Sequence, residues 1–367
     1  MRSLSRPVAL IMRYRPMSAN LVIFENLLRE LPKRVNIEGV MLIPSGLKEP
    51  AVLPEELPVR KIYYPKTLRI WRVSRKLRNY SIYHFIATPR FSSIAARRHP
   101  SIFTVYDLMT LKGIVPRGKR SRENLRRDIR YLNDVDIVHS ISGVTRDDLC
   151  DIAGIDRNRI EVIHIGVDLT TYKVRDKAEA RRLLGLPPER PIVLNVGNEW
   201  GHKNTKRLFT AFSKVLKEVP DALLVRIGHT NEEMSPLIQT LSLGEAVIRT
   251  GPLSGTPHLY YNAADVYVCP DLDTGFGMPN LEAMASGCPI ATSKNGAFPE
   301  VVGDAALLFN PFSEEEMASS IVRLLEDDRL RRELIAEGLE RVKDFAWEKC
   351  ADKIAMLYER LMGNGQA

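Results

Sequence analysis

The segment 264–289 restricts the possible folds of this chain more than any other part of the sequence. It begins with a short apolar run, residues 264–270, whose length and composition are typical of a buried strand. Two glycines, Gly275 and Gly277, follow closely, and the residues beyond Pro279 have the composition of a helix. A buried strand that leads through a tight turn into a helix is the repeating unit of α/β proteins with parallel sheets.

The glycine turn also predicts a place for phosphate. Gly275 and Gly277 let the backbone approach a ligand, and Pro279 suits a first helical position, where no amide hydrogen is needed. The unpaired amides at a helix start attract anions. Glu282, one turn further, suits a vicinal diol such as ribose, because its carboxylate accepts two hydrogen bonds. The segment therefore predicts nucleotide binding, although similar turns also occur in α/β proteins that bind no nucleotide.

A second glycine turn follows another apolar run. Residues 192–197 read as a strand, and Gly197 and Lys203 then precede a helix. A glycine turn with a lysine suits a second set of phosphate contacts. The alternative is a solvated lysine at a helix start, which the helix dipole disfavours.

Length and composition favour two domains in a reducing compartment. A chain of 367 residues is too long for one ordinary core. Residues 8–12 are too short for the apolar region of a signal peptide, and no apolar run approaches the roughly 20 residues that span a bilayer. We therefore expect a cytoplasmic protein. The four cysteines stand far apart, which argues against a zinc site or a disulfide framework: Cys150, Cys269, Cys288 and Cys350.

The net charge of +8 is unevenly distributed along the chain. Residues 1–170 carry 30 Lys and Arg against 17 Asp and Glu, whereas the remainder is mildly acidic. Such asymmetry predicts an anionic partner for the first half. Nucleic acid, an anionic membrane surface and a phosphorylated acceptor all satisfy this requirement, and charge does not choose among them.

Strand-like and helix-like segments alternate in both halves. The first half has strand-like runs at 8–12, 40–43, 82–85, 102–106 and 137–139. The second half begins its own series at 192–197, and helices are expected at 313–326, 328–343 and 348–362. Two doubly wound parallel sheets of this kind bind ligands at the carboxyl ends of their strands.

Residues 260–311 resemble the donor-binding core of family 4, the large retaining family of GT-B glycosyltransferases. The family pattern Gly-Phe-Gly-x-Pro-x-x-Glu-Ala-Met-Ala-x-Gly-x-Pro matches residues 275–289, and Pro-Glu-Val-Val-Gly follows at 299–303. The resemblance implies the GT-B fold, in which two Rossmann-like domains face each other across a cleft and the last helix crosses back to the first domain. It implies an acceptor-binding domain at 1–172 with the helix 348–367, a linker at 173–190, and a donor-binding domain at 191–347.

The resemblance also implies roles for individual residues. The lysine matching Lys203 neutralises the donor diphosphate, whose charge grows as the sugar bond breaks. Together with Lys203, we expect Glu282, Thr274 and Asp107 to act in catalysis. The expected donor-binding residues come from both glycine turns: Gly197, Asn198, Lys203, Gly275, Phe276, Gly277, Met278 and Glu282.

The chain departs from the family pattern at three positions. Thr274 replaces a glutamate that normally touches the donor sugar. A threonine hydroxyl still bonds to a sugar hydroxyl, but it does not stabilise positive charge, and Asp271 or Asp273 is a candidate for the missing carboxylate. Asn198 replaces a frequent arginine, and Tyr106 replaces a histidine that precedes the aspartate.

Two cationic segments lie in the first half. Arg69 and Arg72 belong to a stretch that mixes cations with apolar residues, and Lys119 and Arg120 belong to a second cluster at 112–130. A surface helix of the first type can lie on anionic lipid. We expect these residues to face the acceptor or a membrane, and two solvated helical faces remain the alternative.

These observations favour a metal-independent retaining glycosyltransferase without a cofactor. It would transfer a hexose, mannose or glucose, from a nucleotide sugar to a hydroxyl of a glycan or lipid-linked acceptor in polysaccharide or glycolipid synthesis. Peripheral contact with the inner face of the plasma membrane is compatible with the basic half. A non-catalytic sugar-nucleotide-binding or carbohydrate-binding subunit is the alternative. Nucleic acid is not expected as a partner, because aromatic residues do not alternate with the cations.

Overall fold

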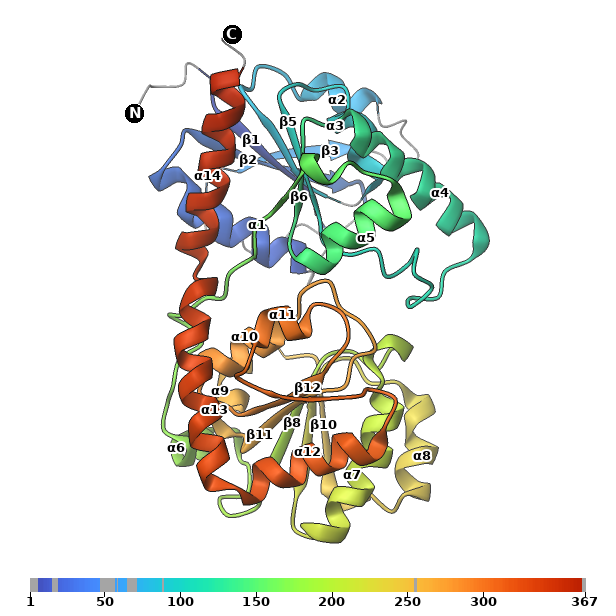
Figure 1. The fold of residues 1–367 in the computed structure, drawn as a ribbon, viewed down its shortest axis with the longest axis vertical. Helices are drawn as coiled ribbons and strands as arrows, with labels where there is room; N and C mark the ends of the chain where they lie inside the picture. The colour runs from blue at the N-terminus through green and yellow to red at the C-terminus, as the bar shows by residue number, and fades with distance from the viewer. Residues whose placement is uncertain are drawn as a thin grey trace. The chain divides into compact units, whose positions relative to one another are not determined.

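The computed structural model describes residues 6–14, 19–46, 57, 59–64, 71–87, 89–253 and 256–364. The chain forms two compact units (Figure 1). The first contains residues 1–166 and 346–367, and the second contains residues 167–345. The first unit is therefore built from both ends of the chain.

The first unit contains a seven-stranded parallel sheet. Its strand order is β3-β2-β1-β4-β5-β6-β7. From β1 the chain adds strands toward one edge, β2 and then β3, and from β4 onward it adds them toward the other edge. This change of strand order between the parallel neighbours β1 and β4 defines a doubly wound sheet. The strands are β1 Val8–Arg13, β2 Ile37–Pro44, β3 Val59–Tyr64, β4 Tyr83–Ile86, β5 Ser101–Val105, β6 Ile137–Ser140 and β7 Ile160–Val162; the helices are α1 Ala19–Glu30, α2 Trp71–Lys76, α3 Ser92–Ala95, α4 Lys119–Arg130, α5 Gly143–Ala153 and α14 Trp347–Asn364.

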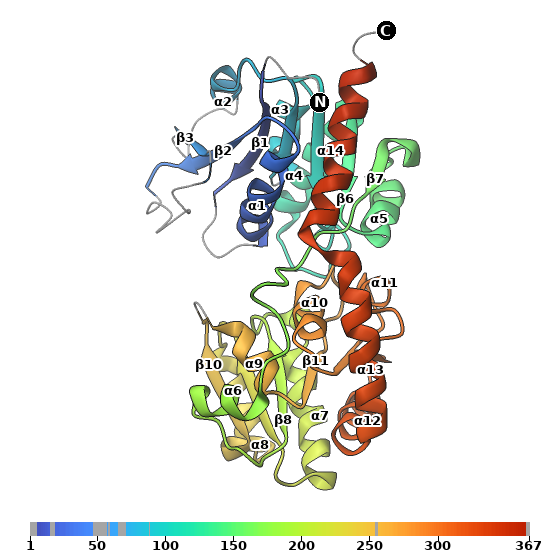
Figure 2. The same cartoon turned by 90° about the vertical axis from the view of Figure 1, so that its left-hand side faces the viewer.

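Helix α14 completes the first unit by packing beside α1 (Figure 1, Figure 2). Arg34, just after α1, forms an ion pair with Asp352 of α14, with 2.5 Å between Nε and Oδ1. At the start of α14, a Cβ atom on Gly166 would lie 2.7 Å from the Trp347 backbone nitrogen. Only glycine therefore fits at position 166 without a shift of the helix.

A directional chain of hydrogen bonds crosses the interior of the first unit. His139 Nε2 lies 2.9 Å from the Ile163 carbonyl oxygen, so this nitrogen donates and Nδ1 of the neutral ring accepts from the Thr104 hydroxyl at 2.9 Å. The Thr104 oxygen then accepts from His84 Nε2 at 2.8 Å, and His84 Nδ1 accepts from the Tyr358 hydroxyl at 2.7 Å. Each histidine nitrogen in this series is either a donor or an acceptor. The series of hydrogen bonds connects α14 to three strands of the sheet.

The second unit contains a six-stranded parallel sheet of order β10-β9-β8-β11-β12-β13. Helix α7 packs against α12, and α6 packs against α9. Buried apolar side chains from β8, β9, β11 and α7 form the core. The strands are β8 Ile192–Val196, β9 Leu223–Ile227, β10 Val247–Gly251, β11 Val266–Cys269, β12 Ile290–Ser293 and β13 Leu307–Phe309; the helices are α6 Lys177–Leu184, α7 Thr205–Glu218, α8 Ser235–Thr240, α9 Pro257–Ala263, α10 Met278–Ala285, α11 Phe298–Val302, α12 Glu314–Glu326 and α13 Asp328–Arg341.

The prediction of two doubly wound parallel sheets is confirmed. Strand β3 was not expected, because two adjacent cations, Arg60 and Lys61, interrupt its apolar residues and it lies at the sheet edge. Residues 173–190, expected to connect the domains, lie within the second unit. There α6 is fixed by Arg181, whose Nη2 lies 2.6 Å from Asp265 Oδ2. In the part of the chain that the structure describes, no helix is long and apolar enough to cross a bilayer.

The histidine chain predicts a loss of stability in mild acid. Burial lowers the pKa of His139 to about 4, and it lowers the pKa of His84 well below the ordinary value of 6.5. Between the lowered pKa values of the folded protein and the ordinary value of 6.5, the unfolded chain binds protons that the folded chain does not. Stability therefore falls as the pH decreases from about 7 to about 4. We expect a loss of about 3 kcal/mol from His139 alone.

Urea unfolding between pH 7 and pH 4.5 tests this expectation. A variant carrying both His84→Gln and His139→Gln should lose most of the pH dependence, whatever its stability at pH 7. An unfolding midpoint of the original protein that does not change with pH over this range would contradict the assignment of two neutral buried rings.

Candidate functional site

The candidate site lies where the strand order of the second sheet reverses, between β8 and β11. Strands β8 and β11 are neighbours at the centre of that sheet and run parallel, with Val266 opposite Val193. Ligands of doubly wound sheets bind outside the carboxyl ends of such a strand pair. The two glycine turns singled out in the sequence follow these same two strands.

Hydrogen bonds and an ion pair join the two turns. The Leu272 amide donates to the His202 carbonyl oxygen at 2.9 Å. Lys203 Nζ lies 2.5 Å from Asp271 Oδ2, and the Asp271 side chain is only 6% exposed. Burial lowers the pKa of the Lys203 ammonium, but the Asp271 carboxylate outweighs this effect and the pKa is raised. The lysine is therefore charged and already paired with a carboxylate.

The first turn is held by the end of β9. Arg226 donates from Nη1 and Nη2 to the Gly197 carbonyl oxygen, at 3.0 and 2.9 Å, and from Nη1 to Asn195 Oδ1 at 2.7 Å. A Cβ atom on Gly228 would lie 2.0 Å from the same carbonyl oxygen. Gly197 has a φ of +147°, and Lys203 Cδ lies 3.7 Å from its ideal Cβ position. These contacts fix the backbone conformation of the turn, and the Lys203 side chain packs against it.

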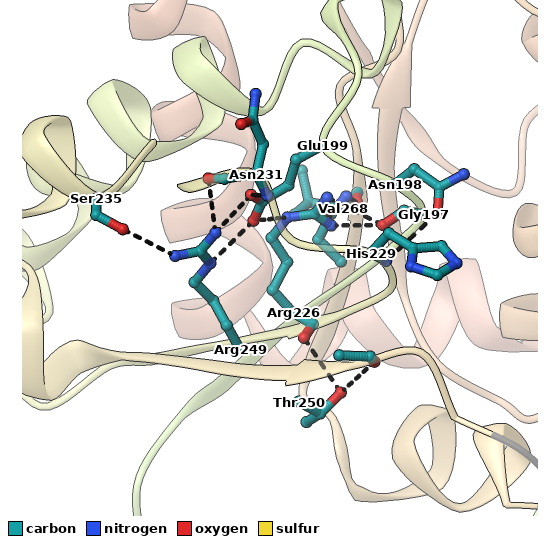
Figure 3. Close-up of polar contacts among 12 residues, drawn as sticks. Gly197, Asn198, Glu199, Arg226, His229, Asn231, Ser235, Arg249, Thr250 and Val268 are labelled. Atoms are coloured by element: carbon teal, nitrogen blue, oxygen red, sulfur yellow. Dashed lines mark hydrogen bonds and ion pairs between the residues drawn. The ribbon is translucent and has the colours of Figure 1, made fainter. Parts of the chain in front are cut away.

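Glu199 connects this turn to β9 and β10 through two arginines, which converge on it in Figure 3. Its carboxylate lies 3.2 Å from Arg226 Nε and 2.7 Å from Arg249 Nη2. The Glu199 amide donates to the His229 carbonyl oxygen at 3.0 Å. The side chain of Glu199 is 1% exposed and that of Arg226 is 2% exposed, so the cluster is buried. Asn198 Oδ1 accepts the His229 amide at 3.3 Å, which is a structural contact within the same group of loops.

The second turn has the glycine requirement that the sequence indicates. Gly277 has a φ of +96°, and a Cβ atom there would lie 2.7 Å from the Phe298 ring. Phe276 is buried and packs edge-to-face against Phe345 at 6.0 Å between centroids. Helix α10 begins at Met278, so Pro279 is its second residue and not the first as expected. Neither position needs an amide hydrogen for the helix ladder.

Thr274 and Asp273 bond within their own loop. The Thr274 hydroxyl oxygen lies 3.4 Å from the Phe276 nitrogen, and Asp273 Oδ1 accepts the Thr274 amide at 2.7 Å. The Thr274 carbonyl oxygen accepts the Ala297 amide at 3.1 Å. Of the two carboxylates that the sequence offers near position 274, one therefore shapes the turn and the other, Asp271, is bound to Lys203.

Glu282 lies on α10 beside two tyrosines. The Tyr261 hydroxyl donates to Glu282 Oε2 at 2.7 Å, and Tyr172 also bonds to this carboxylate. Burial raises the pKa of the Glu282 carboxyl, although both phenol hydrogen bonds oppose the shift. The residue is partly exposed, and a carboxylate has about four acceptor positions, so two phenols do not exhaust it.

The remaining expected site residues belong to the first unit. Asp107 follows β5, and its Oδ1 accepts the Met109 amide at 3.0 Å. The preceding Tyr106 accepts the Thr145 hydroxyl at its carbonyl oxygen. Arg69 lies outside the described residues and Arg72 lies in α2, whereas Lys119 and Arg120 are exposed at the start of α4.

Sequence reasoning did not find the cluster of Glu199, Arg226 and Arg249. Arg226 interrupts the otherwise apolar strand β9, and this is the signal that the sequence contains; β10, which holds Arg249, also has Thr250 and Gly251. Among the described residues, no three His, Cys, Asp or Glu side chains come together as metal ligands.

Two family models match the chain. The model described as "Glycosyl transferases group 1" matches residues 176–341, and the model described as "Glycosyltransferase Family 4" matches residues 22–171. The chain belongs to glycosyltransferase family 4. The two matches correspond closely to the second unit and to the first unit without its C-terminal helix.

Curated relatives of this family member carry related names. The D-inositol 3-phosphate glycosyltransferase of Nocardioides sp. is 30% identical over 56% of the chain and 49% of its own length. The O-antigen chain mannosyltransferase B of Escherichia coli is 34% identical over 46% of the chain and 45% of its own length. The D-inositol 3-phosphate glycosyltransferase of Nocardia farcinica is 30% identical over 71% and 61%. The chain thus spans about half to three-fifths of the length of these relatives.

Solved structures of GT-B glycosyltransferases share the fold of this family member. The sucrose-phosphate synthase of Thermosynechococcus elongatus has a TM-score of 0.82 at 22% identity, over 98% of this chain and 100% of its own. Anabaena HepE in complex with UDP and glucose has a TM-score of 0.83 at 18% identity, over 97% and 100%.

The buried charge cluster predicts a large effect of one substitution on stability. Replacing Glu199 by alanine leaves two arginines without their shared carboxylate, and breaking a buried ion pair costs about 3–5 kcal/mol. The matched control is Glu179→Ala, since Glu179 pairs with Arg182 at the surface, where water screens the pair and its loss should change stability far less. Urea unfolding of both variants measures the difference, and equal losses would contradict the buried network.

Proposed function

We propose that this family 4 member transfers a hexose from a nucleoside diphosphate sugar to an acceptor hydroxyl. The observation that carries the proposal is the adjacency of the two glycine turns at the ends of β8 and β11, with Lys203 between them. A backbone turn, a helix start and a cation at one point provide what a diphosphate needs. The names of the curated relatives and the UDP complex of HepE support the same reading.

The phosphates and the ribose of the donor would each contact a different part of the two turns. The backbone at Gly275, Gly277 and Met278 and the N-terminus of α10 would bind phosphate oxygens. Lys203 would share its charge with the departing phosphate, and the free acceptor positions of Glu282 would bind the ribose diol. Phe276 supports the turn by packing against Phe345.

The proposed reaction retains configuration at the anomeric carbon. The bond from that carbon to the phosphate oxygen breaks, and its electron pair stays on the nucleoside diphosphate. The acceptor oxygen then bonds to the same face, and its proton passes to the leaving phosphate. Lys203 stabilises the charge on that phosphate without a metal ion or a cofactor. Asp107 of the first unit and Thr274 are the proposed contacts to acceptor and sugar.

The acceptor side of the proposal rests on α4. This helix carries six exposed cations, and only Arg127 has an acidic partner among the ion pairs of the described residues that involve them. Its Ile129 is buried in the core of the first unit, whereas all six cations are exposed. We propose that this helix binds an anionic membrane surface that presents a lipid-linked acceptor. The cations are Lys119, Arg120, Arg122, Arg126, Arg127 and Arg130.

A non-catalytic nucleotide-sugar-binding subunit is the second candidate, and one observation favours it. Thr274 stands where a carboxylate is expected, and its hydroxyl oxygen faces the Phe276 amide of its own turn. Donor binding without transfer or donor hydrolysis would support this candidate.

Nucleotide-sugar screening by thermal shift tests donor binding. A fitting donor at 100 times its dissociation constant stabilises the protein by about 2.7 kcal/mol. Lys203→Ala and Glu282→Ala should each abolish the shift, whereas Lys206→Ala, an exposed lysine one turn further along the chain, should preserve it. If both site variants retain the shift, the site assignment is wrong. Proton NMR of the product then determines whether the anomeric configuration is retained.

Reversing charge on α4 tests membrane binding. The double variant Arg122→Glu, Arg126→Glu should sediment with vesicles that contain anionic lipid at least tenfold more weakly than the unmodified protein, because each cation near such a surface contributes about 1 kcal/mol. The control reverses two exposed arginines of the second unit, Arg329 and Arg332. Equal binding by both variants would show that α4 is not the contact surface.

A further inference from the structure

Three cations beside the first glycine turn already have carboxylate partners. Arg226 and Arg249 share Glu199, and Lys203 is paired with Asp271 at 2.5 Å. An incoming diphosphate therefore competes with an internal anion for the lysine that should bind it. This consequence rests on the proposed function, and it concerns Asp271, which the sequence offers only as one candidate for the missing carboxylate.

The position of Asp271 is fixed by its surroundings. It follows Pro270, whose carbonyl oxygen accepts from Asn204 Nδ2 at 3.0 Å, and it precedes Leu272, whose amide bonds to the His202 carbonyl. Both partners flank Lys203 in the sequence. The ion pair is thus enclosed between two backbone contacts that hold the carboxylate and the ammonium group at the same point.

Thr274 stands where the family pattern has glutamate, and the aspartate that pairs with the lysine is three residues earlier, at position 271. The carboxylate is therefore absent from the position that touches the sugar and present beside the lysine. Asp273 does not take that place beside the lysine, because its Oδ1 accepts the Thr274 amide. The substitution changes the charge that the diphosphate meets.

We propose that Asp271 is a positioning residue that lowers the affinity for nucleoside diphosphate by competing for Lys203. When the diphosphate enters, the ammonium exchanges the Asp271 carboxylate for phosphate oxygens. When the diphosphate leaves, the carboxylate takes the ammonium back, so product release does not leave a partly buried, unpaired cation. The pair thereby favours release over tight retention.

Calorimetric titration with UDP and GDP tests the proposal on the full chain. Asp271→Asn removes the competing charge and keeps the shape, so the dissociation constant of whichever diphosphate binds should fall about tenfold. Asp271→Ser, which also removes the carboxylate and keeps a polar side chain, should act in the same direction and serves if the first variant does not fold. Asp221→Asn, at an exposed aspartate just before β9 and outside both turns, is the control and should leave the dissociation constant within about twofold.

A double-mutant cycle separates competition for Lys203 from a general effect on the turn. In the Lys203→Met background, Asp271→Asn should have little effect on diphosphate binding, because the shared cation is absent. In turnover assays Asp271→Asn should lower the KM for the donor without raising kcat. Weaker diphosphate binding by both Asp271 variants, or an equal gain in the Lys203→Met background, would overturn the proposal.

The outcome also distinguishes this inference from the proposed function. If the unmodified protein binds UDP or GDP and Lys203→Met weakens that binding, the donor site stands even when Asp271→Asn gives no gain. If the unmodified protein binds neither diphosphate, the proposed function and the inference that rests on it both fail.

Discussion

The parallel pairing of β8 with β11 is the constraint on which the candidate site depends. These strands are distant in sequence, and their parallel pairing brings the two glycine turns together at the carboxyl ends of the strands. Lys203 and Asp271 come from the two turns and form the closest charged contact across them. A change that separated the strands would remove the site without altering any residue expected to touch a ligand.

Much of this arrangement was predictable from local patterns. The apolar runs and the glycine turns lie where the sequence indicates. The missing part is the charge pairing. Arg226 and Arg249 reach Glu199 only because β9 and β10 lie next to β8, and no local pattern contains that neighbourhood. Likewise, no local pattern predicts that Asp271 pairs with Lys203, which lies in a different turn earlier in the chain.

Two sets of buried charges lie beside the first glycine turn, and they have different consequences. The Glu199 set ties three strand ends together and contains a nearly inaccessible arginine. The Lys203–Asp271 pair is smaller, and its lysine side chain keeps 28% of its exposure. The first set therefore fixes the shape of the turn, while the second can exchange partners with a ligand. This division allows a rigid backbone to present a cation that is still available for chemistry.

The first unit takes its last helix from the far end of the chain, and this has a consequence for biosynthesis. Tyr358 supplies the hydroxyl that His84 needs, and Ile354 on the same helix is fully buried. A ribosome must complete the entire second unit before either side chain emerges. The amino-terminal sheet therefore waits with an open apolar face during translation, and that nascent stage is where a chaperone would have the most surface to bind.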